Sequence, residues 1–289
     1  MRSPARSQAQ VVVSTDAGES YLINASPDLR TQILSASFLA PANAPRHTPI
    51  AGVLLTSADV DSLAGLLHLR EFQPLHIYAT PSVRRSALEE NRIFRVLNRA
   101  NPPAIWQDFP LDTWFALTGA DSQRVEAPIR CRAVPLGGSY PDYVSDGLRR
   151  SSGTDESIIR LLAPDEAIVG LALDLAGKQI FCAPALPGGS GAWKEWVRSS
   201  DVSLLDGTFW CDDELIAAGV GSKTAREIGH VPLSGPDGLL QELGPSTRGR
   251  RVLFHINNTN PILDEESREH REVRDAGWEI AYDGMQIEL

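Results

Sequence analysis

The stretch from residue 54 to residue 66 joins a strand, a polar turn and a helix, and it reads LLTSADVDSLAGL. The apolar run at 52–55 predicts a strand that ends here. Residues 62–70 are apolar on one side and predict a helix. Asp59 and Asp61 lie between the two, where a carboxylate commonly caps a helix by accepting its first backbone N–H groups. Open α/β sheets also build functional sites at this strand edge, so both interpretations stay open.

The same alternation of strand and helix extends outward from this stretch. Short β-branched or aliphatic runs predict nine strands, at residues 11–13, 21–23, 52–55, 75–78, 167–169, 179–181, 202–205, 251–254 and 278–280. Apolar periodicity and capping residues predict helices at 62–70, 82–99, 213–219 and 264–276. The strand-rich middle holds a polar hairpin or loop at 147–156. We predict an α/β (α+β) fold that forms one domain over residues 1–289, because no linker divides the chain.

Composition narrows the class of protein. The chain has 289 residues, 42% of them hydrophobic, and 27 basic against 37 acidic residues give a net charge of −10. An acidic chain argues against a nucleic-acid partner, which favours a basic surface. The N-terminus has no apolar segment of the signal-peptide type, and no apolar run approaches the ~20 residues of a membrane span. We expect a cytoplasmic protein without a membrane partner.

Three further segments place polar residues directly after apolar runs, and they contain Asp206, His230 and His255. Each has a structural interpretation: Asp206-Gly207 is a common turn dipeptide, and a histidine after a buried strand is commonly a hydrogen-bonded core residue. Carboxylates and imidazoles at several strand ends are nevertheless the ingredients of a metal site. The remaining histidines have no such context. We expect His68 and His76 to be packing or surface residues, and His47 and His270 to be exposed.

Residues 56–66 resemble a degraded form of the metallo-β-lactamase signature, Thr-His-x-His-x-Asp-His followed by Gly-Leu. Thr56, Asp61, Gly65 and Leu66 match it, while Ser57, Asp59 and Ser62 occupy its histidine positions. Further segments, taken in order along the chain, resemble the PqqB family of pyrroloquinoline quinone biosynthesis. They are NASPDLR (24–30), RHTPI (46–50), YATP (78–81), DGTFW (206–210), DDE (212–214), GVGSKT (219–224), GH (229–230), HINNTNPIL (255–263) and YDGM (282–285).

The resemblance implies the αββα sandwich of the superfamily, with two mixed sheets face to face and helices outside. It also implies a part in making pyrroloquinoline quinone (PQQ), which is built from a Glu and a Tyr of a precursor peptide. The family is thought to be an iron-dependent hydroxylase of the tyrosine ring, and an older suggestion is export of the cofactor or a precursor.

Two departures from the family pattern affect the expected site. The family usually begins with a strand and a cysteine cluster that holds a structural zinc. This chain starts after them, and Cys131, Cys182 and Cys211 stand apart, so we expect no structural zinc. The missing strand would leave a sheet edge for another chain to pair with, so a homodimer is one expected form. The family also keeps Asp-His where this chain has Asp61-Ser62.

Carried over residue by residue, the resemblance retains Asp61, His230 and His255 as metal ligands and catalytic residues, with Asp206 at the metal site. Two imidazoles and one carboxylate are the set of non-haem Fe(II) oxygenases, so Fe(II), or Zn, is the expected ion at a weakened site. Asp206 could bind the metal or orient a ligand. Asn257 and Asn258 could bind the amino-acid part of a small-molecule or peptide-derived PQQ precursor, or only form a turn.

Three functions follow in order of preference. The first is a metal-dependent oxidoreductase that hydroxylates the precursor. The second is a non-catalytic binding, carrier or transport protein for PQQ or its precursor, with a degenerate metal site. Hydrolysis of the lactamase type comes last, because it needs the histidine-rich signature to generate a metal-bound hydroxide.

Overall fold

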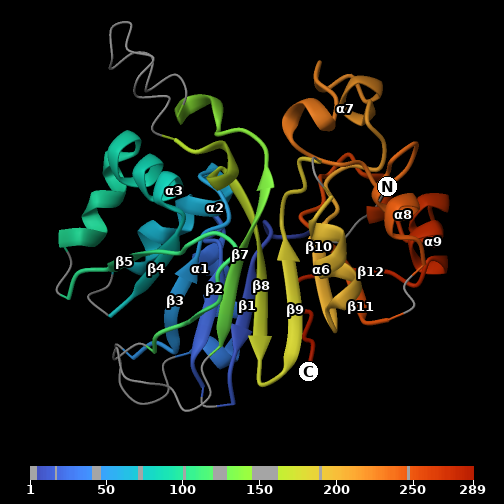
Figure 1. The fold of residues 1–289 in the computed structure, drawn as a ribbon. Coiled ribbons are helices and arrows are strands. Elements are labelled where there is room, and N and C mark those ends of the chain that lie inside the picture. The colour runs from blue at the N-terminus through green and yellow to red at the C-terminus, as the bar shows by residue number, and fades with distance from the viewer. Residues whose placement is uncertain are drawn as a thin grey trace, which may run out of the picture. The chain divides into compact units, whose positions relative to one another are not determined.

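The computed structural model describes residues 5–16, 18–40, 47–70, 74–99, 102–119, 129–144, 162–188, 191–245 and 248–289. The predicted hairpin or loop at 147–156 lies outside these residues. The chain forms two compact units. The N-terminal unit comprises residues 10–135 and 139–169, and the C-terminal unit comprises residues 1–9, 136–138 and 170–289. Figure 1 shows the elements of both units in chain order.

The N-terminal unit is built on a five-stranded mixed sheet. Its strands follow chain order, β1 (Val11–Ser14), β2 (Ser20–Ile23), β3 (Ile50–Leu54), β4 (His76–Ala79) and β5 (Ile105–Asp108). The first pair is antiparallel, and every later pair is parallel. Two more strands, β6 (Phe115–Ala116) and β7 (Arg130–Gly137), pair antiparallel.

Short helices connect the parallel strands of this unit. They are α1 (Leu29–Ser35), α2 (Val60–Leu63), which continues as a 3₁₀ turn (Ala64–Leu69), and α3 (Pro81–Arg85). Helix α3 continues as a π-helical turn (Ser86–Glu90) and then as a 3₁₀ helix (Arg92–Arg99). Two further 3₁₀ turns lie at Ser37–Leu39 and Pro164–Glu166. Thr80 is the N-cap residue of α3: its Oγ1 accepts a hydrogen bond from Val83 N at 3.2 Å. The Thr-Pro-Ser segment predicts this helix start.

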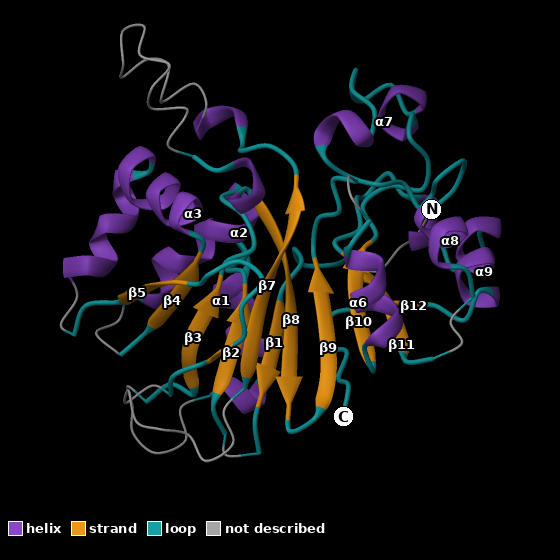
Figure 2. Cartoon of the chain, in the orientation of Figure 1, coloured by secondary structure: helices purple, strands orange, loops and turns teal. Residues whose placement is uncertain are grey.

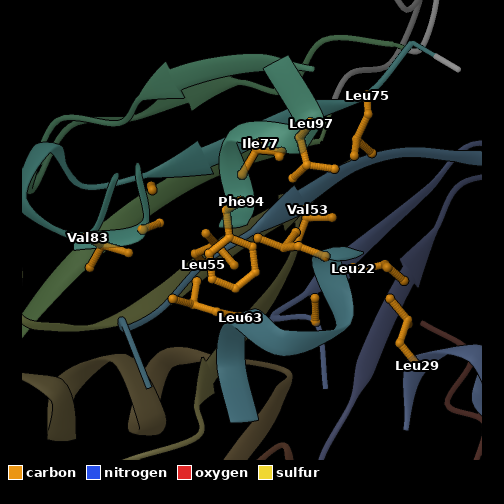
Figure 3. Close-up of a cluster of buried hydrophobic side chains, with 14 of the residues drawn as sticks. Leu22, Leu29, Val53, Leu55, Leu63, Leu75, Ile77, Val83, Phe94 and Leu97 are labelled. Carbon is orange, nitrogen blue, oxygen red and sulfur yellow. The ribbon is translucent and has the colours of Figure 1, made fainter. Parts of the chain in front are cut away.

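The core of the N-terminal unit lies between this sheet and its helices. Leu22, Val53 and Ile77 come from three neighbouring strands, and none of them is exposed. Figure 3 shows these strand side chains meeting Leu63 and Phe94 from the helical segments. Burying one such side chain contributes about 1.5–3 kcal/mol. The helices are only one or two turns long, so this packing, rather than intrinsic helix propensity, holds them in place.

The C-terminal unit contains a second mixed arrangement of strands. β8 (Ile168–Leu175) pairs antiparallel with β9 (Lys178–Ala183), across a tight turn in which Ala176 and Gly177 both have positive φ. Parallel pairings then join β9 to β10 (Val202–Asp206), β10 to β11 (Arg250–Phe254) and β11 to β12 (Glu279–Ile280). Because β9 to β12 are parallel, their carboxyl ends meet at one edge.

The described residues of the C-terminal unit include the connecting helices α6 (Trp193–Ser199), α7 (Glu214–Ala217), α8 (Leu239–Leu243) and α9 (Arg268–Asp275). Further 3₁₀ turns lie at Arg226–Ile228 and Pro261–Leu263. Figure 2 shows α7 beyond the carboxyl end of β9, at the strand edge that the parallel connections leave for a site. No helix within the described residues combines the length and apolarity that crossing a bilayer requires.

All nine predicted strands are present, with bounds that differ by a few residues. The helices predicted at 62–70, 82–99, 213–219 and 264–276 begin near the expected positions, but their α-helical parts are shorter. α9 begins after Ser267, whose Oγ accepts from His270 N at 2.9 Å, so Asp264 lies before the helix. Helices α1, α6 and α8 were not predicted. None of them has a side-chain capping bond at its start. The N-cap residues of α6 and α8 are Ala192 and Gly238, which carry no side-chain capping group, whereas α1 follows Asp28.

Candidate metal centre

Asp206 is the last residue of β10, and it is completely buried. The following glycine lets this strand end approach β11: Gly207 N donates to Phe254 O at 2.8 Å, and a Cβ on Gly207 would come within 3.0 Å of that same oxygen. Asp206 is strand and Gly207 follows it without a turn, so the turn interpretation of this dipeptide is wrong and the glycine serves a close approach of two strand ends. It leaves the Asp206 carboxylate inside the C-terminal unit.

Among the described residues, four hydrogen bonds to the Asp206 carboxylate are resolved. Oδ2 accepts from Leu186 N at 2.9 Å and from His230 Nδ1 at 2.7 Å. Oδ1 accepts from Thr208 N at 3.1 Å and from Thr208 Oγ1 at 2.5 Å. Burial alone would raise the pKa of Asp206, but the neighbouring His230 and His255 side chains outweigh burial and hold the pKa well below its usual range. The carboxylate is therefore ionised at neutral pH.

His255 follows the end of β11 with φ of 54°, in the left-handed region that non-glycine residues rarely adopt. Such backbone persists where the surroundings hold it, and it is enriched at functional sites. Thr208 Oγ1 provides two of the holding contacts, since it lies 2.9 Å from His255 Nδ1 and 2.9 Å from His255 O. The direct distance from His255 Nδ1 to Asp206 Oδ1 is 3.8 Å, so the hydroxyl stands between them.

His230 comes from the loop after the 3₁₀ turn at Arg226–Ile228, where Gly229 has φ of 90°. The His230 ring stacks on the His255 ring, with ring centroids 5.6 Å apart. Phe209 packs edge-on against the His230 ring, with centroids 5.8 Å apart. The two histidine side chains are 15% and 24% exposed. Both imidazoles are therefore enclosed by protein but reachable from solvent.

These three residues fit a metal ion. One ligand atom from each of Asp206, His230 and His255 can be chosen so that all three atoms lie within 4.8 Å of one another. Within the described residues, these are the His, Cys, Asp or Glu side chains that come together closely enough to share a metal ion. Two imidazoles with a carboxylate suit Zn²⁺ or a non-haem Fe(II) ion. Asp206 and His255 lie at the ends of two strands, as the sequence predicts, whereas His230 follows a 3₁₀ turn and not a strand, so the predicted strand before it is wrong.

Asp61 belongs to the first turn of α2 in the N-terminal unit, and its assignment as a ligand stays a prediction. The neighbouring residues show what replaces the histidines of the signature. Ser57 Oγ donates to Asp59 Oδ2 at 2.7 Å and lies 3.0 Å from Ser62 Oγ, and both serines are buried. Asp59 occupies the N-cap position of α2, but its side chain makes no capping hydrogen bond, so the capping interpretation is wrong for it.

The asparagine run after His255 is mostly structural. Asn260 is fully buried, its Nδ2 donates to Gly207 O at 2.9 Å, and its Oδ1 accepts from Ile262 N at 3.1 Å. Asn257 Nδ2 donates to Thr259 Oγ1 at 2.8 Å, while Asn258 is exposed. The turn interpretation holds for Asn260, and substrate binding by Asn257 and Asn258 stays a prediction.

Sequence reasoning missed two residues of this site, Thr208 and Glu214. Thr208 contacts both Asp206 and His255, and the Asp-Gly-Thr segment gave no local signal for that contact. The buried Glu214 accepts from Trp210 N at 2.6 Å and from Thr259 Oγ1 at 2.5 Å. An acidic residue at the start of a helix is ordinary, so only the fold reveals its long-range partner.

The other histidines and the cysteines lie outside this group. His76 is buried on β4, with Nδ1 2.8 Å from Gln107 Nε2, as the packing interpretation expects. His47 and His270 are half-buried rather than exposed; His270 Nδ1 lies 2.8 Å from Ile262 O, since α9 packs beside that turn. Cys131, Cys182 and Cys211 form no disulfide, and the absence of a structural zinc stays a prediction.

Comparison with known proteins identifies the family. The β-lactamase superfamily domain matches residues 19–256. Coenzyme PQQ synthesis protein B of Gluconacetobacter diazotrophicus is 39% identical over 285 residues, which cover 99% of this chain and 88% of that protein. The chain belongs to the PqqB family. A Zn²⁺-bound PqqB from Methylobacterium extorquens has a similar structure, with a TM-score of 0.84 and 35% identity over 100% of this chain and 89% of that one.

A more distant neighbour of this PqqB family member shares the fold. A diphosphatase of the PhnP family has a TM-score of 0.59 at 16% identity, and the match covers 98% of this chain and 84% of that chain. The expected metallo-β-lactamase fold, with two mixed sheets and helices, is confirmed.

Gly65, which the signature shares with this chain, has a structural role in the fold. Gly65 N donates to Ala25 O at 2.8 Å, and a Cβ at this position would lie 2.2 Å from Ser26 O.

Proposed function

We propose that this chain performs the PqqB step in making PQQ, and that the step is a metal-dependent oxygenation of the tyrosine ring of a peptide-derived precursor. The observation that carries the proposal is the group of Asp206, His230 and His255 at the strand edge of a PqqB family member. Two imidazoles and a nearby carboxylate retain metal-binding chemistry, although this chain lacks the histidines of the signature.

His230 and His255 would hold the metal, with Asp61 as the carboxylate ligand that the family resemblance supplies. Asp206 would either bind the ion or orient an imidazole that does. When bound, Fe(II) supplies the activation of O₂ that ring oxygenation needs, whereas Zn²⁺ has no redox chemistry to offer. Asn257 and Asn258 lie two and three positions after His255, and we assign them to the amino-acid part of the precursor.

A carrier function is the second candidate, and one observation favours it. Ser57 and Ser62 stand at histidine positions of the signature and their hydroxyls lie 3.0 Å apart, buried from solvent. A pair of hydroxyls that bond to each other is a poor substitute for two imidazole ligands. A chain altered in this way could still bind PQQ or its precursor without acting on it.

One experiment separates the two candidates. Metal-free protein is loaded with Fe(II) or, as a matched control, with Zn²⁺, and is given the precursor under ¹⁸O₂ together with an external two-electron reductant such as ascorbate, so that one oxygen atom can enter the ring while the other leaves as water. Oxygenation predicts one ¹⁸O atom in the product by mass spectrometry with Fe(II), none with Zn²⁺, and none for His255→Ala loaded with Fe(II). Precursor binding without ¹⁸O incorporation under every condition would overturn the oxygenase proposal and establish the carrier.

A further inference from the structure

The β3–α2 connection, residues 55–59, leads into the helical turn of Asp61, and a tyrosine from a distant segment holds it. We infer that Tyr143 is a positioning residue of the metal site: its phenol hydroxyl fixes the Ala58 carbonyl and thereby sets the direction of the first turn of α2, to which Asp61 belongs. The inference deepens the proposed function and rests on it in taking Asp61 as a metal ligand. It assigns to Tyr143 a role that no motif in the sequence indicates.

Two anchors flank the middle of the β3–α2 connection. At its start, Thr56 N donates to Asn24 Oδ1 at 2.8 Å, and Asn24 Nδ2 donates to Thr56 Oγ1 at 2.9 Å. Beyond it, in α2, Ser62 O accepts from Ala25 N at 2.8 Å. Asn24 and Ala25 follow β2, the strand beside β3, so both anchors come from within one sheet. They fix the start of the connection and the helix after it, and they leave Ala58 to other contacts.

Tyr143 supplies a contact at Ala58. Its hydroxyl donates to Ala58 O across 85 positions of sequence, and the phenol is the donor because a carbonyl has no proton. Ala58 is completely buried and Tyr143 is half-buried. The tyrosine is itself held by packing, because Tyr140 and Tyr143 both lie against the buried Val144 and Leu162. The phenol therefore links a packed cluster to the β3–α2 connection.

The Ala58 peptide group matters to Asp61 because α2 begins directly after it. Asp59 is the N-cap residue, and its carbonyl accepts from two N–H groups of α2 at 3.0 Å. Asp61 lies in the first turn, which these bonds close. Burial, together with the nearby Asp59 and Asp61 carboxylates, raises the pKa of Tyr143 to about 12. The phenol thus lies close to both carboxylates and keeps its donor proton at neutral pH.

A carboxylate that is held in position before a metal arrives binds it without first losing conformational freedom, so loss of the Tyr143 contact should weaken metal binding. Tyr143→Phe removes the hydroxyl and keeps the ring. With Zn²⁺ alone in a chelator competition, we expect its affinity to fall about 10-fold, the lower end of the usual cost of removing a contact that supports a ligand. Tyr140→Phe is the matched control, since the Tyr140 hydroxyl donates to Ala163 O at 2.6 Å, outside the connection. Its affinity should equal that of the wild type.

The Asp61→Asn background distinguishes positioning from a general loosening of the fold. Asp61→Asn alone should lower the Zn²⁺ affinity, because it replaces an ionised ligand with a neutral amide. When Tyr143→Phe is added to Asp61→Asn, the affinity should fall by less than about 2-fold further, because Tyr143 acts through Asp61. A purely structural role would cost the same 10-fold in both backgrounds, and that result would overturn the inference.

The single variants separate failure of the inference from failure of the proposed metal site. An unchanged affinity in Tyr143→Phe, or an equal loss in Tyr140→Phe, overturns the inference, while a loss in Asp61→Asn leaves the metal site standing. An unchanged affinity in Asp61→Asn overturns the ligand assignment and the inference with it. Neither precursor nor O₂ is present, so these results are independent of the ¹⁸O experiment.

A crystal structure of the Zn²⁺-loaded wild type decides the question should Tyr143→Phe fail to fold. The inference expects an Asp61 oxygen at about 2.0–2.2 Å from the ion, with the Tyr143 hydroxyl still bonded to Ala58 O. Asp61 bound to the ion with that hydroxyl turned away from Ala58 would overturn the inference.

Discussion

The Glu214 carboxylate and the Thr259 hydroxyl join the two loops that follow the metal-centre strands, with 2.5 Å between Glu214 Oε1 and Thr259 Oγ1. Glu214 Oε2 also accepts from Trp210 N at 2.6 Å, and Asn257 Nδ2 donates to Thr259 Oγ1 at 2.8 Å. One buried carboxylate thus connects the loop after Asp206 to the loop after His255. The metal centre depends on both loops keeping their places.

Replacing Glu214 should therefore destabilise the protein. Glu214→Ala leaves the Trp210 amide and the Thr259 hydroxyl without their acceptor, and we expect the free energy of unfolding to fall by about 2–3 kcal/mol. Glu214→Gln keeps the size and one acceptor oxygen, and should lose about half as much. Urea denaturation measures both. A fall of less than ~0.5 kcal/mol in the free energy of unfolding of Glu214→Ala would show that the hydrogen bonds of Glu214 do not stabilise the fold.

The ion pair between Arg250 and Glu279 predicts a stability change in acid. Arg250 Nε lies 2.7 Å from Glu279 Oε1, and a second bond of 2.8 Å joins Nη2 to Oε2, so β11 and β12 are tied by a two-point contact. This hydrogen bonding lowers the pKa of Glu279 below its ordinary value. Because the pKa of Glu279 is lower in the folded state than in the unfolded state, the ion pair stabilises the fold fully above the unfolded-state pKa. This stabilisation is lost as the pH falls through the folded-state pKa of Glu279.

Glu279→Gln should accordingly lose about 0.5–1 kcal/mol of stability at neutral pH, the usual contribution of a partly exposed pair. The difference from wild type should vanish once the pH is below the folded-state pKa of Glu279. Denaturation midpoints measured from neutral to acidic pH test this. Glu265→Gln at an exposed site is the control, and a deficit for Glu279→Gln that persists unchanged in acid would contradict the explanation.

His255→Ala should weaken metal binding strongly. It removes one of the two imidazoles of the centre, and we expect the affinity for Zn²⁺ to fall by roughly 100-fold or more. Competition with a chromophoric chelator measures the constant. His270→Ala is the matched control, because that imidazole contacts the Ile262 carbonyl at 2.8 Å in the same unit. Equal affinity in both variants would place the metal elsewhere in the chain.

Ser62→His should strengthen metal binding, since it restores an imidazole at the position where the family has one. Ser62 is buried and its Oγ lies 3.0 Å from Ser57 Oγ, so the larger side chain should also cost about 1–3 kcal/mol of stability. Ser62→Phe carries a comparable steric cost without a ligand atom. A Zn²⁺ affinity for Ser62→His no higher than that of Ser62→Phe would show that our account of the lost ligand is wrong.

The same substitution gives a prediction at the level of the pathway. In a strain whose own PqqB gene is deleted, this chain should support little PQQ, because loss of a metal ligand weakens a site even when the fold survives. The Ser62→His variant should support more. Chromatographic measurement of PQQ in the culture provides the readout, and full production with the unaltered chain would show that Ser62 is harmless.

Local sequence was sufficient for the strands but not for every helix. Runs such as 202–205 and 251–254 are short and mostly apolar, with a valine in each, so they predicted β10 and β11 without knowledge of their neighbours. Helices α6 and α8 follow Ala192 and Gly238, neither of which makes a side-chain capping bond. Their positions depend on the strands they pack against, and no window of sequence contains that information.

The sequence by itself determined the family, the strand-rich α/β pattern and the residue types of the metal centre, because Asp206, His230 and His255 each follow a recognisable segment. The tertiary structure alone decided how these residues act on one another. Parallel pairing brings the ends of β10 and β11 to one edge, and there the Thr208 hydroxyl stands between Asp206 and His255. Hydrogen-bond partners 20 to 47 positions apart are set by the folded backbone, and no spacing in the sequence specifies them.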